Sequence, residues 1–249
     1  MARLLRTKGE SGQKLMNQLS ITTSQRKAAI ILLVTPLLLT FYSYFGLPVF
    51  YDVNLAGYFP ASYLSGFYRY YYNFLAALLL FLLLPGLLIK LGFREKLKAY
   101  GFRRGDYKFG LKAVAWSLPI VFLASWLPSR QADFQQEYSA FLDNPLTFQT
   151  FFIYAAAFFL YYLAFEFFFR GFLLYGLKPA FGRLNSLLIQ TIPCCLVHIG
   201  KPLNEVLAAI LASLIFGYLA LRTESIWYGV VIHWLVGVFL ILFIGLGAG

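Results

Sequence analysis

The sequence predicts an all-α protein, a bundle of about seven transmembrane helices (seven or eight spans). Of its 249 residues, 60% are hydrophobic and only 12% are charged, whereas a soluble domain is nearer half apolar and a quarter charged. Apolar runs long enough to cross a bilayer recur along the chain, and most Lys and Arg residues cluster at the ends of these runs. Together these observations indicate a polytopic membrane protein.

The formal net charge of +11 does not indicate nucleic-acid binding. Positive residues at the ends of apolar runs anchor the cytoplasmic side of a membrane protein, so we expect a lipid bilayer and no nucleic acid as partner. The two cysteines, Cys194 and Cys195, are adjacent within an apolar run. This spacing gives neither a disulfide framework nor a metal site.

The chain order predicts a basic cytoplasmic tail at residues 1–27, followed by a single membrane domain at 28–249. The loop at 47–66 has no Lys or Arg and is expected outside. The loop after residue 92 is the most basic and is expected in the cytoplasm. The expected spans are residues 28–46, 67–92, 111–127, 147–177, 184–199, 203–221 and 226–246.

Two of these spans have special features. The run at 147–177 exceeds the ~20 residues of a straight crossing, so it is expected to tilt, break or protrude. Lys178 and Arg183 mark its inner end, which places Glu166 in the half of the bilayer nearer the cytoplasm. In the sixth span, Ala209, Ser213 and Gly217 recur every four residues and permit close contact with another helix.

The deep polar residues fall almost entirely in the last four spans. Glu166 and Arg170 are four residues apart, so on a helix they share a face and can pair. His198, Glu205 and His233 follow on later spans. An isolated charge in a membrane helix costs at least ~2.5–3.5 kcal/mol, so these residues indicate either an ion pair that joins helices or a catalytic site, with the catalytic-type core at about 148–238.

Two Glu, two His and an Arg are suited to hydrolysis of an acyl or peptide bond. A carboxylate in a low-dielectric site can take a proton from water, one imidazole can orient that water, and the other can donate to an oxyanion. Zinc held by His198, His233 and a Glu is an alternative, although no HExxH motif is present. A proton-coupled carrier is another alternative, but the sequence has no internal repeat.

The order of these residues resembles the CAAX protease and bacteriocin-processing family (CPBP, also called Abi). The family pattern is EExxxR on one helix, FxxxH on the next and HxxxN or HxxxD on a late helix. The resemblance covers about residues 148–238. Here the pattern appears as Phe165, Glu166 and Arg170, then Cys194 and His198, then His233 and Gly237.

The resemblance implies an intramembrane endopeptidase of the CAAX prenyl protease type II kind in a bacterial cell membrane. The distribution of Lys and Arg predicts that its N-terminus is cytoplasmic. It implies a membrane-associated peptide or protein as substrate and no cofactor. The implied roles are general base or orienter for Glu166, water-binding partner for His198, oxyanion donor for His233, support of Glu166 for Arg170, and a reserve base for Glu205.

Three positions depart from the family pattern. Phe165 replaces the first Glu, which is the favoured activator of water in the family. Cys194 replaces the Phe of FxxxH, and Gly237 replaces the Asn or Asp that would help the late His. These departures support a second hypothesis, a catalytically inactive member that acts as a binding, immunity or regulatory partner in the membrane.

Overall fold

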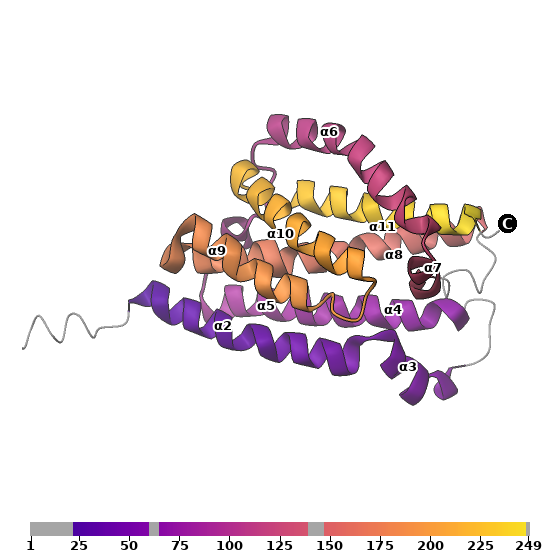
Figure 1. The fold of residues 1–249 in the computed structure, drawn as a ribbon. Coiled ribbons are helices and arrows are strands. Elements are labelled where there is room, and N and C mark those ends of the chain that lie inside the picture. The colour runs from indigo at the N-terminus through magenta and orange to yellow at the C-terminus, as the bar shows by residue number, and fades with distance from the viewer. Residues whose placement is uncertain (1–21, 60–64, 139–146, 248–249) are drawn as a thin grey trace, which may run out of the picture.

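The computed structural model describes residues 22–59, 65–138 and 147–247, which form helices and no strand (Figure 1). The predicted all-α class is confirmed. The α-helices are α2 (Thr23–Phe41), α3 (Pro48–Asn54), α4 (Ser65–Ala77), α5 (Leu84–Leu87), α6 (Tyr107–Trp126), α7 (Ala132–Tyr138), α8 (Phe148–Glu166), α9 (Gly176–Leu196), α10 (Leu203–Thr223) and α11 (Trp227–Gly247). Short 3-10 or π-helical segments extend or join them: η1 (Tyr42–Gly46), η2 (Ala56–Tyr58), η3 (Leu78–Leu83), η4 (Leu88–Gly92), η5 (Leu97–Tyr100), η6 (Pro128–Arg130) and η8 (Phe167–Tyr175).

The first helix begins before the expected span. Thr22 and Gln25 form a capping box, in which the Thr22 hydroxyl accepts from the Gln25 backbone N–H at 3.2 Å and the Gln25 side chain accepts from the Thr22 N–H at 2.9 Å. Arg26 and Lys27 therefore belong to α2 rather than to the tail. The rest of the predicted tail, residues 1–21, lies outside the described residues.

Six helical segments in the described ranges are long and apolar enough to cross a membrane. The fourth, Phe151–Leu196, has 46 residues. At ~1.5 Å per residue this is more than twice the ~30 Å thickness of a hydrocarbon layer. Gly182 interrupts it with φ 76° and ψ 178°, and the chain turns back there along the rest of α9. With this division, the six segments correspond to the seven expected crossings.

The central helix of the bundle is formed by α8 and its continuation η8. Helices α4 and α11 pack along α8, while α2, α9 and α10 pack along η8. All nine residues of η8 are buried. The π-helical form is rare in runs longer than one turn and occurs mainly at functional sites, and here it begins directly after Glu166.

The small-residue stripe on α10 faces α9, as the sequence predicts. Ala209, Ser213 and Gly217 are buried, and the Ser213 hydroxyl accepts from Gln190 Nε2 at 3.1 Å. A Cβ on Gly217 would overlap the Leu187 side chain. The two helices therefore approach closely because position 217 has no side chain.

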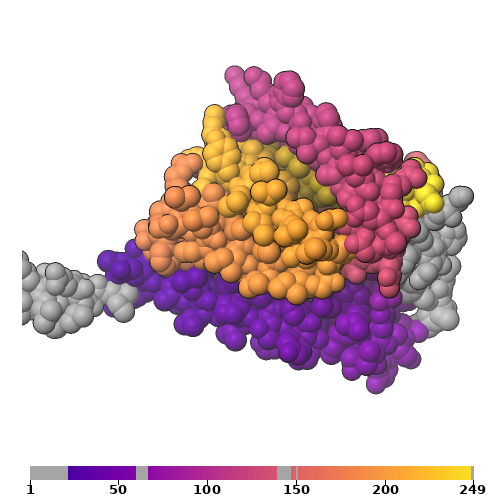
Figure 2. Space-filling model, viewed as in Figure 1, coloured from indigo at the N-terminus to yellow at the C-terminus, as the bar shows by residue number. Residues whose placement is uncertain are grey.

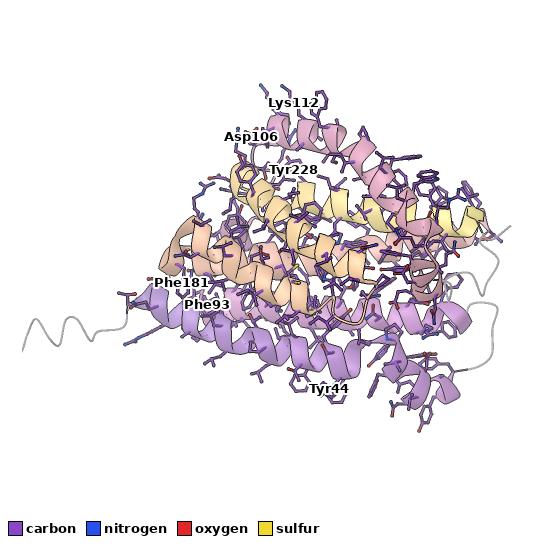
Figure 3. All side chains as sticks on the ribbon, viewed as in Figure 1. Tyr44, Phe93, Asp106, Lys112, Phe181 and Tyr228 are labelled. Atoms are coloured by element: carbon purple, nitrogen blue, oxygen red, sulfur yellow. The ribbon has the colours of Figure 1, made fainter. Side chains whose placement is uncertain are left out.

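The basic loop before α6 is bonded to the turn between α10 and α11. The Asp106 N–H donates to the Thr223 carbonyl at 2.8 Å, and the Asp106 carboxylate pairs with Arg222 at 2.9 Å. Gly105 lies against the same carbonyl with φ 58°, where a side chain would overlap it. Figure 3 labels Asp106 at this end of the bundle, which we call the basic end.

We predict that Gly217→Val destabilises the protein by about 1–3 kcal/mol, because overpacking forces α9 and α10 apart. The matched control is Gly86→Val, since nothing lies within 4 Å of a Cβ at Gly86. Thermal unfolding in detergent micelles measures both variants. Equal melting temperatures for the two variants would contradict the α9–α10 contact.

Candidate active site

Glu166 is fully buried and is held by two partners. Its Oε1 lies 3.3 Å from Arg170 Nη1 and 2.7 Å from His233 Nδ1. Its Oε2 has no hydrogen-bond partner within the described part of the chain. This oxygen faces Gly229, where a Cβ would lie 3.2 Å away. The carboxylate therefore bridges two helices, and the missing side chain at Gly229 gives it space.

Arg170 is enclosed on the other side of Glu166. Its guanidinium lies over the Phe216 ring at 5.6 Å and near the Phe169 ring at 5.9 Å. Its Nη1 donates to Cys194 Sγ at 3.6 Å. A buried charge is costly unless it is paired, so the ion pair expected from the four-residue spacing compensates for the Arg170 charge.

Phe165 lies between the two imidazoles. Its ring centroid is 5.7 Å from that of His198 and 5.5 Å from that of His233, with interplanar angles of 81° and 85°. It is 3% exposed and lines the same cavity as the two histidines. The first acid of the family pattern is thus replaced by an aromatic ring that contacts both histidines.

The partners of the imidazoles fix their tautomers. His198 Nδ1 lies 2.7 Å from the Cys194 carbonyl oxygen, and because a carbonyl can only accept, Nδ1 carries the hydrogen. In the neutral ring with this tautomer, His198 Nε2 is an acceptor. His233 Nδ1 faces the Glu166 carboxylate, which is paired with Arg170, so it also donates. A neutral His233 likewise has an acceptor at Nε2.

Two cavities meet at the histidines. The larger, about 490 Å³, extends from Pro48 and Glu137 to the two imidazoles. The smaller, about 240 Å³, is apolar and is flanked by α6, α10 and α11; part of α11 is visible between α6 and α10 in Figure 2. His198, Glu205 and His233 line both cavities, whereas Glu166 lines neither. Of the four acids and histidines predicted to share a site, three face the common space and Glu166 lies behind His233.

Glu205 reaches this space from the first turn of α10. The Tyr138 hydroxyl donates to the Glu205 carboxylate, with distances of 2.9 and 3.0 Å to its two oxygens. Tyr138 belongs to α7, between the third and fourth expected spans. No sequence pattern links it to Glu205, because the contact depends on how α7 folds back over α10.

Tyr162 is a second residue that the sequence analysis missed. It lies one turn before Glu166, its ring centroid is 4.4 Å from that of His233, and it lines both cavities. A Cβ on Gly237 would overlap the Tyr162 hydroxyl and the Phe158 ring. The Asn or Asp of the family pattern therefore has no room here. The four-residue spacing from Glu166 is the signal that was available in the sequence.

The zinc alternative requires His198, His233 and a Glu around one point. Among the residues that the structure describes, no three His, Cys, Asp or Glu side chains are grouped to hold a metal ion. Both Nδ1 atoms already donate to protein oxygens. The three-ligand set of the zinc alternative is therefore not assembled in this conformation.

A comparison with protein-family models matches residues 144–239 to the family described as Rce1-like, type II CAAX prenyl endopeptidase Rce1-like. The matched segment contains Glu166, Arg170, His198, Glu205 and His233. No curated protein and no solved structure matches the chain. The family match and the order of the motifs agree, and together they support membership of the CAAX protease and bacteriocin-processing family over residues 144–239.

Proposed function

We propose that this integral membrane protein is an endopeptidase that hydrolyses a peptide bond of a membrane-associated peptide or protein. The observation that carries the proposal is the 2.7 Å hydrogen bond between Glu166 Oε1 and His233 Nδ1, because the His233 ring lines a cavity shared with His198 and Glu205. A carboxylate that orients an imidazole beside such a cavity is suited to general base catalysis.

In this proposal His233 is the general base and Glu166 is a positioning residue. A water molecule in the cavities meets the imidazole and not the carboxylate, because Glu166 lines neither cavity. Glu166 holds the ring through Nδ1 and stabilises the imidazolium that forms when Nε2 takes a proton. This assignment differs from the sequence-based expectation, in which Glu166 is the base and His233 donates to the oxyanion.

The proposed reaction uses two proton transfers, one from water to His233 and one from His233 to the leaving amide nitrogen. Nε2 of His233 takes a proton from water as the water oxygen bonds to the peptide carbonyl carbon. The imidazolium then returns the proton to the amide nitrogen as the carbon–nitrogen bond breaks. The Nε2 acceptor of His198 orients the same water, and Glu205 is a second acceptor in the cavity. No cofactor is required for these steps.

We further propose that the protein resides in a bacterial cell membrane with its N-terminus in the cytoplasm. Support for this orientation comes from the basic residues at the end of the bundle where α2 begins. Lys27 of α2 pairs with Glu95 of the basic loop at 2.9 Å, so the start of α2 and this loop lie on the same side.

One observation favours the alternative function, an inactive membrane protein that binds a partner. Phe165 stands between the histidines in place of the favoured activator of water. A cavity with this ring at its base can bind an apolar side chain without cleaving the peptide. The alternative predicts a stable complex and no product.

We predict that Glu166→Gln and His233→Gln each lower kcat by about 10²–10⁴-fold, the typical contribution of a general base. The assay uses the protein in lipid nanodiscs with internally quenched CAAX-type peptides, prenylated and unprenylated. Asp133→Asn, an exposed acid on α7, is the matched control and should retain full activity. Folding of each variant is checked by its melting temperature.

Two outcomes would count against catalysis by this pair. Unchanged cleavage in folded Glu166→Gln would remove Glu166 from the mechanism. Absence of product from the wild-type protein, together with stable retention of one of these peptides, would support the binding function.

A further inference from the structure

We infer that the active-site cavity opens on the non-cytoplasmic side of the membrane, and that its substrate is a peptide presented from that side. This inference rests on the proposed peptidase function for the identity of the substrate. The orientation of the cavity rests on different observations, which are the positions of its mouth and of the basic residues.

The larger cavity extends to the end of the bundle opposite the basic end. Its outer wall includes Pro48 of α3, Glu137 of α7 and Lys201 of the turn between α9 and α10. Figure 1 places α3, α7 and this turn at one end (right), and the start of α2 and the connection before α6 at the other (left). We call the first of these the mouth end.

The two ends differ strongly in positive charge. Of the described Lys and Arg residues, the mouth end has only Arg69, Arg130 and Lys201. Arg69 pairs with Asp52 at 2.7 Å and Lys201 pairs with Glu137. The basic end has Arg26, Lys27, Lys90, Arg94, Lys96, Lys98, Arg103, Arg104, Lys108, Lys112, Lys178, Arg183 and Arg222. Because Lys and Arg are retained on the cytoplasmic side, the mouth end faces away from the cytoplasm.

The cavity can reach deep into the bilayer because the crossing after Gly182 is short. From Arg183 to Leu196 the helix rises about 21 Å, at ~1.5 Å per residue, against ~30 Å for the hydrocarbon layer. The turn that carries His198 therefore lies within the apolar layer. The site that contains Glu166 and His233 is reached from the mouth end.

The walls indicate the kind of peptide that fits. The mouth has the Lys201–Glu137 ion pair, which can exchange partners with a polar peptide backbone or a terminal charge. Beyond the histidines, the smaller cavity is lined by Ala208, Ala212 and Leu240 and suits an apolar side chain. We expect a peptide with an apolar residue next to the cleaved bond, exposed on the outer surface of the membrane.

The test is labelling of single added cysteines with a membrane-impermeant maleimide in intact bacterial cells that express the full chain. Val49→Cys lies at the mouth, where Val49 is 61% exposed, and should be labelled. Ala99→Cys lies in the exposed part of the basic loop and should be labelled only after the cells are permeabilised. The wild-type protein, with Cys194 and Cys195 inside α9, gives the background.

The reverse labelling pattern would overturn the inference and leave the proposed peptidase function intact. If labelling follows the expected pattern but the protein cleaves no peptide, the peptidase function is rejected and the inferred orientation of the cavity stands. The two failures are therefore distinguishable.

A separate observation points to Tyr162 as the donor that stabilises the oxyanion. His198 Nδ1 lies against the Cys194 carbonyl oxygen and His233 Nδ1 lies against the Glu166 carboxylate, so neither Nδ1 hydrogen is available to a peptide carbonyl. The Tyr138 hydroxyl already donates to Glu205. Within the described ranges no hydrogen bond joins the Tyr162 hydroxyl to another residue, and Tyr162 lines both cavities beside His233.

Tyr162 therefore supplies the O–H donor that the peptidase mechanism needs when the peptide carbonyl becomes an oxyanion. We expect Tyr162→Phe to lower kcat by about 10²–10³-fold, the usual effect of losing one such donor, with KM changed little. Tyr161→Phe is the matched control, since Tyr161 is the next residue on the helix and its hydroxyl bonds to Tyr42.

A purely structural role for Tyr162 would lower the melting temperature and leave kcat unchanged in the folded fraction. This result would overturn the assignment. A peptide aldehyde, which forms a tetrahedral adduct with bound water, provides a second measurement. Its affinity should fall in Tyr162→Phe and stay unchanged in Tyr161→Phe.

Discussion

The site depends on one buried carboxylate shared by two cations or potential cations. Glu166 lies between Arg170 and His233 with no exposed surface. Removing any one of the three leaves an uncompensated polar group in a low-dielectric interior. The π-helical segment, the missing side chain at Gly229 and the aromatic enclosure of Arg170 all follow from the need to hold this carboxylate in place.

The departures from the family pattern are connected by packing. Tyr162 occupies the volume that a side chain at Gly237 would fill, and Cys194 replaces a bulky ring with a sulfur that accepts from Arg170. Phe165 fills the space between the histidines. Each of the three changes is accommodated by a neighbouring side chain.

Much of the fold could be predicted from the sequence. The length of each apolar run predicts a membrane span, and the clusters of Lys and Arg predict where the spans end. Pairs and stripes within one helix are also predictable, because residues four apart share a face. Examples are the Glu166–Arg170 pair and the stripe formed by Ala209, Ser213 and Gly217. Contacts between helices depend on the rotation and depth of each one. For this reason the contact between Tyr138 and Glu205, the π-helical segment and the separation of Glu166 from the cavity were not predictable.

The short crossing after Gly182 also affects the surrounding lipids. A helix shorter than the hydrocarbon layer causes hydrophobic mismatch, and the bilayer adapts by thinning at a cost of fractions of a kcal/mol per Å. Water and headgroups would then lie closer to the end of α9 than to the rest of the bundle. The protein would favour thin membranes, and a peptide bond near the lipid surface would have a shorter distance to travel to the histidines.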